Sequence, residues 1–102
     1  MLYSEYLRPV NLYDTGISDQ VYITIAKETP EAHQFLKMYP QAEPTVDRSG
    51  SLAVDFWADG NKQRVRIFIN PRNHRPGKIF LDSNGKVTWI NTLNQLRKDN
   101  AF

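Results

Sequence analysis

Alternating apolar and polar positions run through the second half of the chain and predict strands. The four segments with this period-two pattern are residues 51–58, 62–70, 78–82 and 86–90. The turn Asp59-Gly60-Asn61 joins the first two segments, and the turn Ser83-Asn84-Gly85 joins the last two. Both turns contain residues that accept a positive φ angle. Because short turns join antiparallel neighbours, the pattern predicts a mostly antiparallel sheet.

A helical period marks the segment just before these strands. Thr29 is a good N-cap, Pro30 suits the first helical position, and Pro40 ends the segment. The apolar positions between them follow at i, i+3, i+4 and i+7 and are Ala32, Phe35, Leu36 and Tyr39. This apolar stripe needs an apolar surface, and one face of the sheet supplies it.

Residues 20–26 have the sequence Gln-Val-Tyr-Ile-Thr-Ile-Ala, which alternates and is rich in β-branched residues. Such a pattern is typical of a strand. We therefore predict a first strand here, with Val21, Ile23 and Ile25 pointing inward.

The remaining segments complete a predicted α+β fold. Residues 41–48 contain Pro44, so a strand here is short or lies at an edge, and residues 92–98 predict a last short helix. The predicted order is β-α-β-β-β-β-α, a mostly antiparallel sheet of four to six strands with one amphipathic helix packed on one face. Residues 1–19 are predicted to form an N-terminal arm docked on a single domain of residues 20–102.

Length and residue usage limit the class of protein. The chain has 102 residues, which suits one domain. It has no cysteine, which excludes disulfides, thiolate metal sites and cysteine nucleophiles. No stretch reaches the roughly 20 apolar residues of a membrane span, and residues 1–6 lack the pattern of a signal peptide. We expect a cytoplasmic protein without membrane contact; an earlier removal of a signal peptide would instead place it outside the cytoplasm.

Charge is distributed unevenly along the chain. Residues 1–59 hold four basic and nine acidic side chains, a net charge of −5, whereas residues 60–90 hold seven basic and one acidic, a net charge of +6. This asymmetry indicates a charged partner. Alternatively, the two halves face each other in the fold and their charges largely cancel.

Side-chain alternation gathers aromatic and basic residues on one face of the sheet. The set predicted to point inward is Leu52, Val54, Phe56, Val65, Ile67 and Ile69. The outward set, and our candidate binding residues, are Trp57, Arg64, Arg66, Phe68, Lys78 and Phe80. Tryptophan and arginine are favoured anchors of protein interfaces, so we predict a non-catalytic binding domain that engages a protein partner or a second copy of itself.

Two alternatives apply to the same face. Aromatic rings interleaved with arginines also bind single-stranded nucleic acid, because rings stack on bases while cations meet phosphates. In the second alternative the face is structural: the N-terminal arm covers Trp57 and Phe68, and the arginines lie over the rings as cation–π pairs.

Catalytic, metal-binding and nucleotide-binding motifs are not recognisable, so we predict no catalytic site, no metal and no cofactor. His33 lies one position off the helical stripe and is expected at the surface. A small enzyme without a familiar motif is a further alternative, and His74 with Asp82 is the pair it would use. The segment Asp82-Ser83-Asn84-Gly85 starts like a calcium loop but lacks the closing glutamate. The residues thus favour a non-catalytic role.

Residues 29–90 resemble the PepSY-type domains, in which a short helix packs on an antiparallel sheet. The segments that carry this resemblance are Thr29-Pro30-Glu31, Phe35-Leu36, Tyr39-Pro40, residues 65–69 and residues 82–87. The resemblance implies a non-catalytic, extracytoplasmic domain associated with the inhibition or regulation of peptidases. The sequence departs from that family in lacking a signal or anchor and in having a longer predicted sheet.

Overall fold

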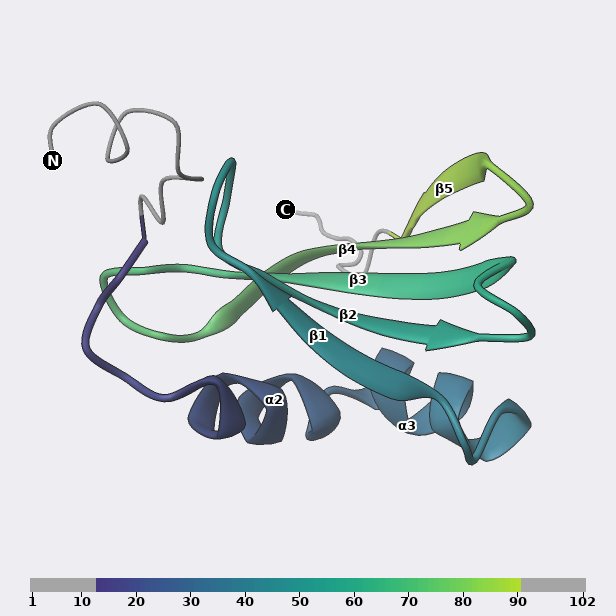
Figure 1. Cartoon of the computed structure of the whole chain (residues 1–102), viewed down its shortest axis with the longest axis horizontal. Helices are drawn as coiled ribbons and strands as arrows, with labels where there is room; N and C mark the ends of the chain where they lie inside the picture. Colours follow the sequence, from purple (N-terminus) through teal and green to yellow (C-terminus); the bar gives the residue numbers. More distant parts are fainter. Residues whose placement is uncertain (1–12, 91–102) are drawn as a thin grey trace, which may run out of the picture.

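The computed structural model describes residues 13–90, which form two helices and a five-stranded antiparallel sheet (Figure 1). The elements are α2 (Asp19–Lys27), α3 (Pro30–Met38), β1 (Glu43–Asp47), β2 (Ala53–Ala58), β3 (Gln63–Ile69), β4 (Pro76–Ser83) and β5 (Lys86–Ile90). Each strand pairs with the next along the chain, in the order β1-β2-β3-β4-β5. The predicted α+β class and antiparallel sheet are confirmed. The predicted helix at residues 92–98 lies outside the described residues.

The first predicted strand is wrong, because residues 20–26 belong to helix α2. Both helices therefore precede all five strands. Tyr22 and Ala26, four residues apart, form the buried side of α2, whereas Val21 is 46% exposed. The burial thus follows a helical period and not the alternation that the prediction used.

Local signals explain why this segment becomes a helix. Ser18 precedes it in an extended conformation, Asp19 lies in its first turn and Lys27 in its last turn. These charges complement the helix dipole. The strand preference of β-branched residues is small and depends on context, so the burial of Tyr22 and Ala26 against the sheet decides the outcome.

Helix α3 forms as predicted, and Thr29 makes hydrogen bonds to both α3 and α2. The N–H group of Ala32 donates to Thr29 Oγ1 over 3.2 Å, which caps α3. The Thr29 hydroxyl in turn donates to the carbonyl of Ala26 at the end of α2, over 2.8 Å. Thr29 therefore fixes the corner between the two helices.

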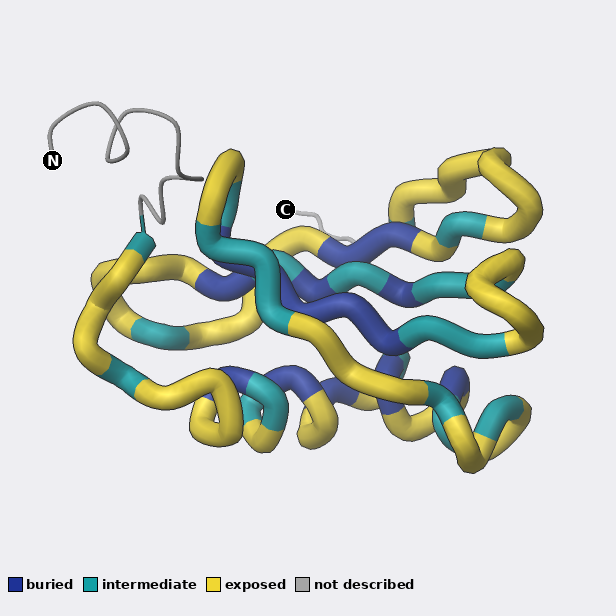
Figure 2. The backbone as a smooth tube through the Cα atoms, in the orientation of Figure 1, coloured by how far each residue is buried: buried dark blue, intermediate teal, exposed yellow. Residues whose placement is uncertain are grey.

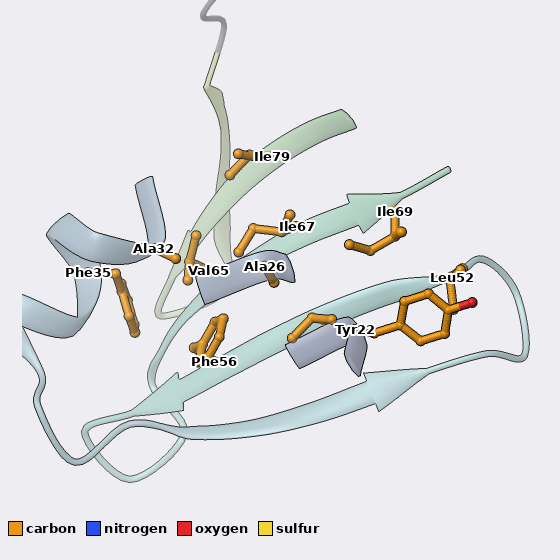
Figure 3. Close-up of a cluster of buried hydrophobic side chains, with 11 residues drawn as sticks. Tyr22, Ala26, Ala32, Phe35, Leu52, Phe56, Val65, Ile67, Ile69 and Ile79 are labelled. Atoms are coloured by element: carbon orange, nitrogen blue, oxygen red, sulfur yellow. The ribbon is translucent and has the colours of Figure 1, made fainter. Parts of the chain in front are cut away.

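The helices cover one face of the sheet, and we call this the inner face (Figure 1). Figure 2 shows the buried residues along the central strands and on the sides of the helices that meet them. Figure 3 shows core side chains from both layers meeting in this space. The core residues contributed by the sheet and its loops are Leu52, Val54, Phe56, Val65, Ile67, Ile69 and Ile79. The predicted inward set is therefore confirmed.

The first described residues contact the domain. Tyr13 and Ile17 pack against the core, and the N–H group of Tyr13 donates to the carbonyl of Arg48 over 3.1 Å. The end of the predicted arm thus contacts the domain, while residues 1–12 lie outside the described residues. Strand β1 contains Pro44 and is an edge strand, as predicted.

Neither described helix has the length and apolar character that crossing a membrane requires.

Candidate binding face

The sheet has a second face that neither helix covers, and we call it the outer face. The residues that the strand register places on it, from β1 to β5, are Glu43, Thr45, Asp47, Ala53, Asp55, Trp57, Arg64, Arg66, Phe68, Phe80, Asp82, Val87 and Trp89. In the register of the strands, Trp57 is opposite Arg64 and Arg66 is opposite Phe80. Residues directly opposite in a ladder share a face. The predicted outward residues Trp57, Arg64, Arg66, Phe68 and Phe80 therefore lie together on this face. Lys78 is exposed and lies where the β3–β4 register shifts, so the ladder does not assign it a partner.

Arg66 is the centre of an ion-pair network on the outer face. Its Nε and Nη2 donate to the two carboxylate oxygens of Asp55, each over 2.8 Å, and Nη2 also donates to Asp47 Oδ2 over 2.9 Å. Asp55 is only 2% exposed. The hydrogen bonds to Asp55 raise the pKa of the Arg66 guanidinium above its usual value, so this group stays charged. The paired geometry is the strong, bidentate kind.

The carboxylate of Asp47 is stabilised from two sides. It accepts from the backbone N–H of Ser49 over 2.9 Å and from the Ser49 hydroxyl over 2.8 Å. The Ser49 N–H, followed by the Ser49 hydroxyl and Arg66, lowers the pKa of Asp47 below 3.8, against the opposing effect of burial. Asp47 is therefore ionised at neutral pH and holds Arg66 from strand β1.

Arg64 is held between two rings and two carboxylates. Its guanidinium carbon lies 4.8 Å from the ring centre of Trp57 and 5.1 Å from that of Phe80. Its Nη2 donates to Asp82 Oδ2 over 2.9 Å, and Nη1 lies 3.5 Å from Asp55 Oδ1. Its Nε is buried and meets no hydrogen-bond acceptor in the described part of the chain. These contacts match the predicted structural cation–π alternative for Arg64.

The charges of the network nearly cancel. Two arginines of the basic half of the sequence meet three aspartates, of which Asp47 and Asp55 come from the acidic half. This supports the alternative that the two halves face each other. Arg72, Arg75 and Lys78 form no ion pair within residues 13–90 and lie in or just after the loop between β3 and β4.

Phe68, Phe80 and Trp89 form an aromatic cluster beside the ion pairs. Phe80 and Trp89 meet edge to face with ring centres 5.0 Å apart, and Phe68 stacks on Trp89 at 5.9 Å. The guanidinium of Arg66 lies 5.5 Å from the Phe68 ring centre. Trp89 is 55% exposed, whereas Phe80 is 8% exposed. One indole of this cluster is thus open to a partner.

Trp57 stands apart from this cluster at the edge of an open hollow. Its indole Nε1 donates to Thr45 Oγ1 over 2.9 Å, and its ring is half-buried. The hollow has a volume of about 870 Å³ and is lined by residues 38–43, Thr45 and residues 57–61. Its charged lining residues are Glu43 and Asp59.

The structure does not assemble the pair that an enzyme would use. His74 lies in the β3–β4 loop with its ring 5.8 Å from the ring of Tyr22, on the side of the helices. Asp82 lies near the far end of β4 and contacts Arg64 on the outer face. At about 3.3 Å per strand residue, β4 keeps the two roughly 20 Å apart. His33 is exposed, as predicted. Residues 13–90 contain no group of three or more His, Asp or Glu side chains placed to hold a metal ion.

Comparisons with protein-family models, curated proteins and solved structures find no match for this chain. The resemblance to PepSY-type domains therefore stays a prediction.

The predicted binding residues did not include four residues of the outer face: Asp47, Asp55, Asp82 and Trp89. Trp89 could have been found from the turn, because a two-residue loop at Asn84-Gly85 places Phe80 opposite Trp89. The aspartates carried no comparable signal, because their contacts depend on the pairing of strands that are distant in sequence.

Proposed function

We propose that this protein is a non-catalytic binding domain that engages a protein surface through the outer face, with Trp89 as its exposed anchor. The observation that carries the proposal is the position of Trp89: it is 55% exposed, yet it packs against two further rings of a sheet face that no described helix covers. Tryptophans at the centre of such patches are common hot spots of protein interfaces.

The ion-pair network supports this role by fixing the face before a partner arrives. Arg66 is held by two carboxylates and lies over Phe68, which stacks on Trp89. A contact surface that is rigid before binding loses less conformational entropy on binding. In this proposal Arg64 and Arg66 support the surface, and Trp89, Phe68 and the exposed Lys78 contact the partner.

The charge balance favours a protein over a single-stranded nucleic acid. Nucleic-acid affinity depends on cations that are free to neutralise phosphates. Arg64 and Arg66 are already paired with three aspartates, which would repel a phosphate backbone. The aromatic part of the surface remains, and it suits apolar side chains of a protein.

Site-specific photocrosslinking tests the proposal. The full chain carries benzoylphenylalanine at position 89 or, as a matched control, at position 21, because Val21 is an exposed apolar residue on α2. We expect a discrete protein adduct from position 89 and none from position 21. Equal labelling at both positions in folded protein would overturn the proposal.

A nucleic-acid control accompanies this experiment. Fluorescence anisotropy of a labelled oligothymidine measures binding at low salt. We expect no saturable binding. Saturable binding that weakens steeply with salt and is lost on Trp89→Ala would instead assign the face to nucleic acid.

A further inference from the structure

The two edges of the sheet are built differently. Edge strand β1 contains Pro44, which has no N–H to donate, and the acidic Glu43 and Asp47. Proline and charge are the usual protection of an edge against pairing with another chain. Edge strand β5 has the sequence Lys-Val-Thr-Trp-Ile, with one charge and no proline. Its first four residues, Lys86 to Trp89, are exposed. Figure 2 shows the hairpin of β4 and β5 with most of its outermost strand in the colour of exposed residues.

The turn before β5 determines which of its backbone groups are free. Asn84 and Gly85 have φ angles of 53° and 86°, as in a type I′ turn. The pair that closes this turn is Ser83 with Lys86, and the hydrogen-bonded pairs of an antiparallel ladder then alternate. It follows that the N–H and C=O groups of Val87 and Trp89 point away from β4, toward the edge at which no other strand of residues 13–90 pairs.

We propose that β5 pairs antiparallel with β5 of a second copy of the chain, around a two-fold axis at Thr88. This proposal rests on the proposed function, because Trp89 belongs to both surfaces. In this register Val87 lies opposite the partner's Trp89, and the two residues exchange two backbone hydrogen bonds. Thr88 lies opposite the partner's Thr88, and Lys86 lies opposite the partner's Ile90.

The side chains of β5 complement each other in this register. A β-branched residue opposite an aromatic one, and threonine opposite threonine, are favourable cross-strand pairs. The one charged residue, Lys86, faces an apolar residue and not a second lysine. A shift by one pair in one direction would place Trp89 opposite the partner's Gly85, and a shift in the other would carry Val87 beyond the end of β5.

The two-fold axis stands perpendicular to the sheet, so both outer faces lie on the same side. The two aromatic clusters then meet across the axis, because Trp89 of each copy packs beside the partner's Val87. The helices of both copies lie together on the opposite side. The outcome is a continuous sheet in which the exposed edge of β5 is no longer free.

Cysteine crosslinking tests the register, because the chain has no cysteine of its own. In the proposed pairing, Thr88 and the partner's Thr88 form a close pair without hydrogen bonds, whose Cβ atoms approach to about 4.5–5.5 Å. Thr88→Cys should therefore oxidise to a covalent dimer. Thr45→Cys is the matched control, since Thr45 is the exposed middle residue of the other edge strand. It should stay mainly monomeric under the same conditions.

A proline substitution tests the backbone pairing separately. Val87→Pro removes an N–H that points away from β4, so the β4–β5 ladder keeps its hydrogen bonds. Light scattering coupled to size exclusion should give a concentration-dependent mass between 11.8 kDa and twice that value for the unmodified chain. We expect Val87→Pro to weaken self-association at least tenfold and the control Val87→Thr to leave it within about threefold.

Two results would overturn the inference: a mass of one chain at every concentration, or equal crosslinking of Thr88→Cys and Thr45→Cys. The failure of the proposed function would look different. If the chain is monomeric but position 89 still labels another protein, the dimer alone is rejected. If position 89 labels only a second copy of the chain while Thr88→Cys crosslinks, the dimer stands and the proposed binding of another protein by the outer face is rejected.

Discussion

The inner and outer faces come from the same strands but are held together by different forces. On the inner face Phe56, Val65 and Ile67 are fully buried against the helices. On the outer face Asp55 is almost as buried, although no described helix covers it. On this face, arginine side chains that pair with Asp55 and pack on aromatic rings provide the cover that the helices provide on the inner face. Burial alone therefore does not distinguish the faces; the inner face depends on packing, and the outer face on paired charges.

The inner face should show the largest loss of stability when a side chain is shortened. Phe56→Ala removes a fully buried ring and leaves a cavity, which should lower the free energy of unfolding by about 3–5 kcal/mol. Urea denaturation followed by circular dichroism measures this value. Phe56→Leu keeps most of the volume and should cost less than about 2 kcal/mol. Similar losses for the two variants would show that the inner face is loosely packed.

The outer face should instead depend on the pairing of its charges. Arg66→Met leaves the buried Asp55 without its bidentate partner, and we expect a loss of about 3 kcal/mol. Asp55→Leu combined with Arg66→Met removes both charges and should recover part of that loss. A double variant that is less stable than Arg66→Met would contradict this description of the face.

The difference between the faces also explains what sequence reasoning could predict about the fold. Alternation in residues 51–58 and 62–70 predicted both faces of β2 and β3, because burial on one face imposes a period of two. Residues 20–26 are too few to distinguish the two periods, because their apolar positions fit a strand and a helix alike. The pair Tyr22 and Ala26, with Ser18 and Asp19 before it, was the helical signal.

The candidate site was predictable in part. Alternation placed Trp57, Arg64, Arg66 and Phe68 on one face. It could not show that Arg66 on β3 reaches Asp47 on β1, because that contact depends on two strand registers at once. The alternation of side chains predicts which face of the sheet a residue lies on. Predicting an ion pair also requires the register of the strands, which the alternation does not give.

Acid should weaken the outer face through Asp47. The pKa of this carboxyl is lowered in the folded protein, mainly by the Ser49 N–H. Its contribution to stability is therefore complete above the unfolded value of 3.8 and is lost as the pH falls through the lower folded pKa. We expect Asp47→Asn to reduce the pH dependence of unfolding below pH 3.8 in urea titrations.

Ser49→Ala is the control for this experiment, because it keeps the backbone N–H that is the main cause of the shift. Because Ser49→Ala also removes the hydroxyl, a smaller cause of the lowered pKa, its pH dependence should lie between that of the unmodified protein and that of Asp47→Asn, closer to the unmodified protein. If Asp47→Asn and the unmodified protein lose stability in parallel below pH 3.8, Asp47 does not contribute through its charge.

Substitution of Trp89 should cause the smallest loss in the free energy of unfolding. The size of this loss shows whether the exposed indole serves folding or is available for binding. Trp89 and Phe80 touch at 5.0 Å between ring centres, yet Phe80 is 8% exposed and Trp89 is 55% exposed. At concentrations where the chain is monomeric, Phe80→Ala should cost about 2–3 kcal/mol, and Trp89→Ala about 1 kcal/mol or less. Urea denaturation followed by circular dichroism compares the two. A large surface-exposed indole that adds little to folding is available for binding. If Trp89→Ala destabilises the fold as much as Phe56→Ala does, the aromatic cluster is a second core, and the outer face offers no anchor to a partner.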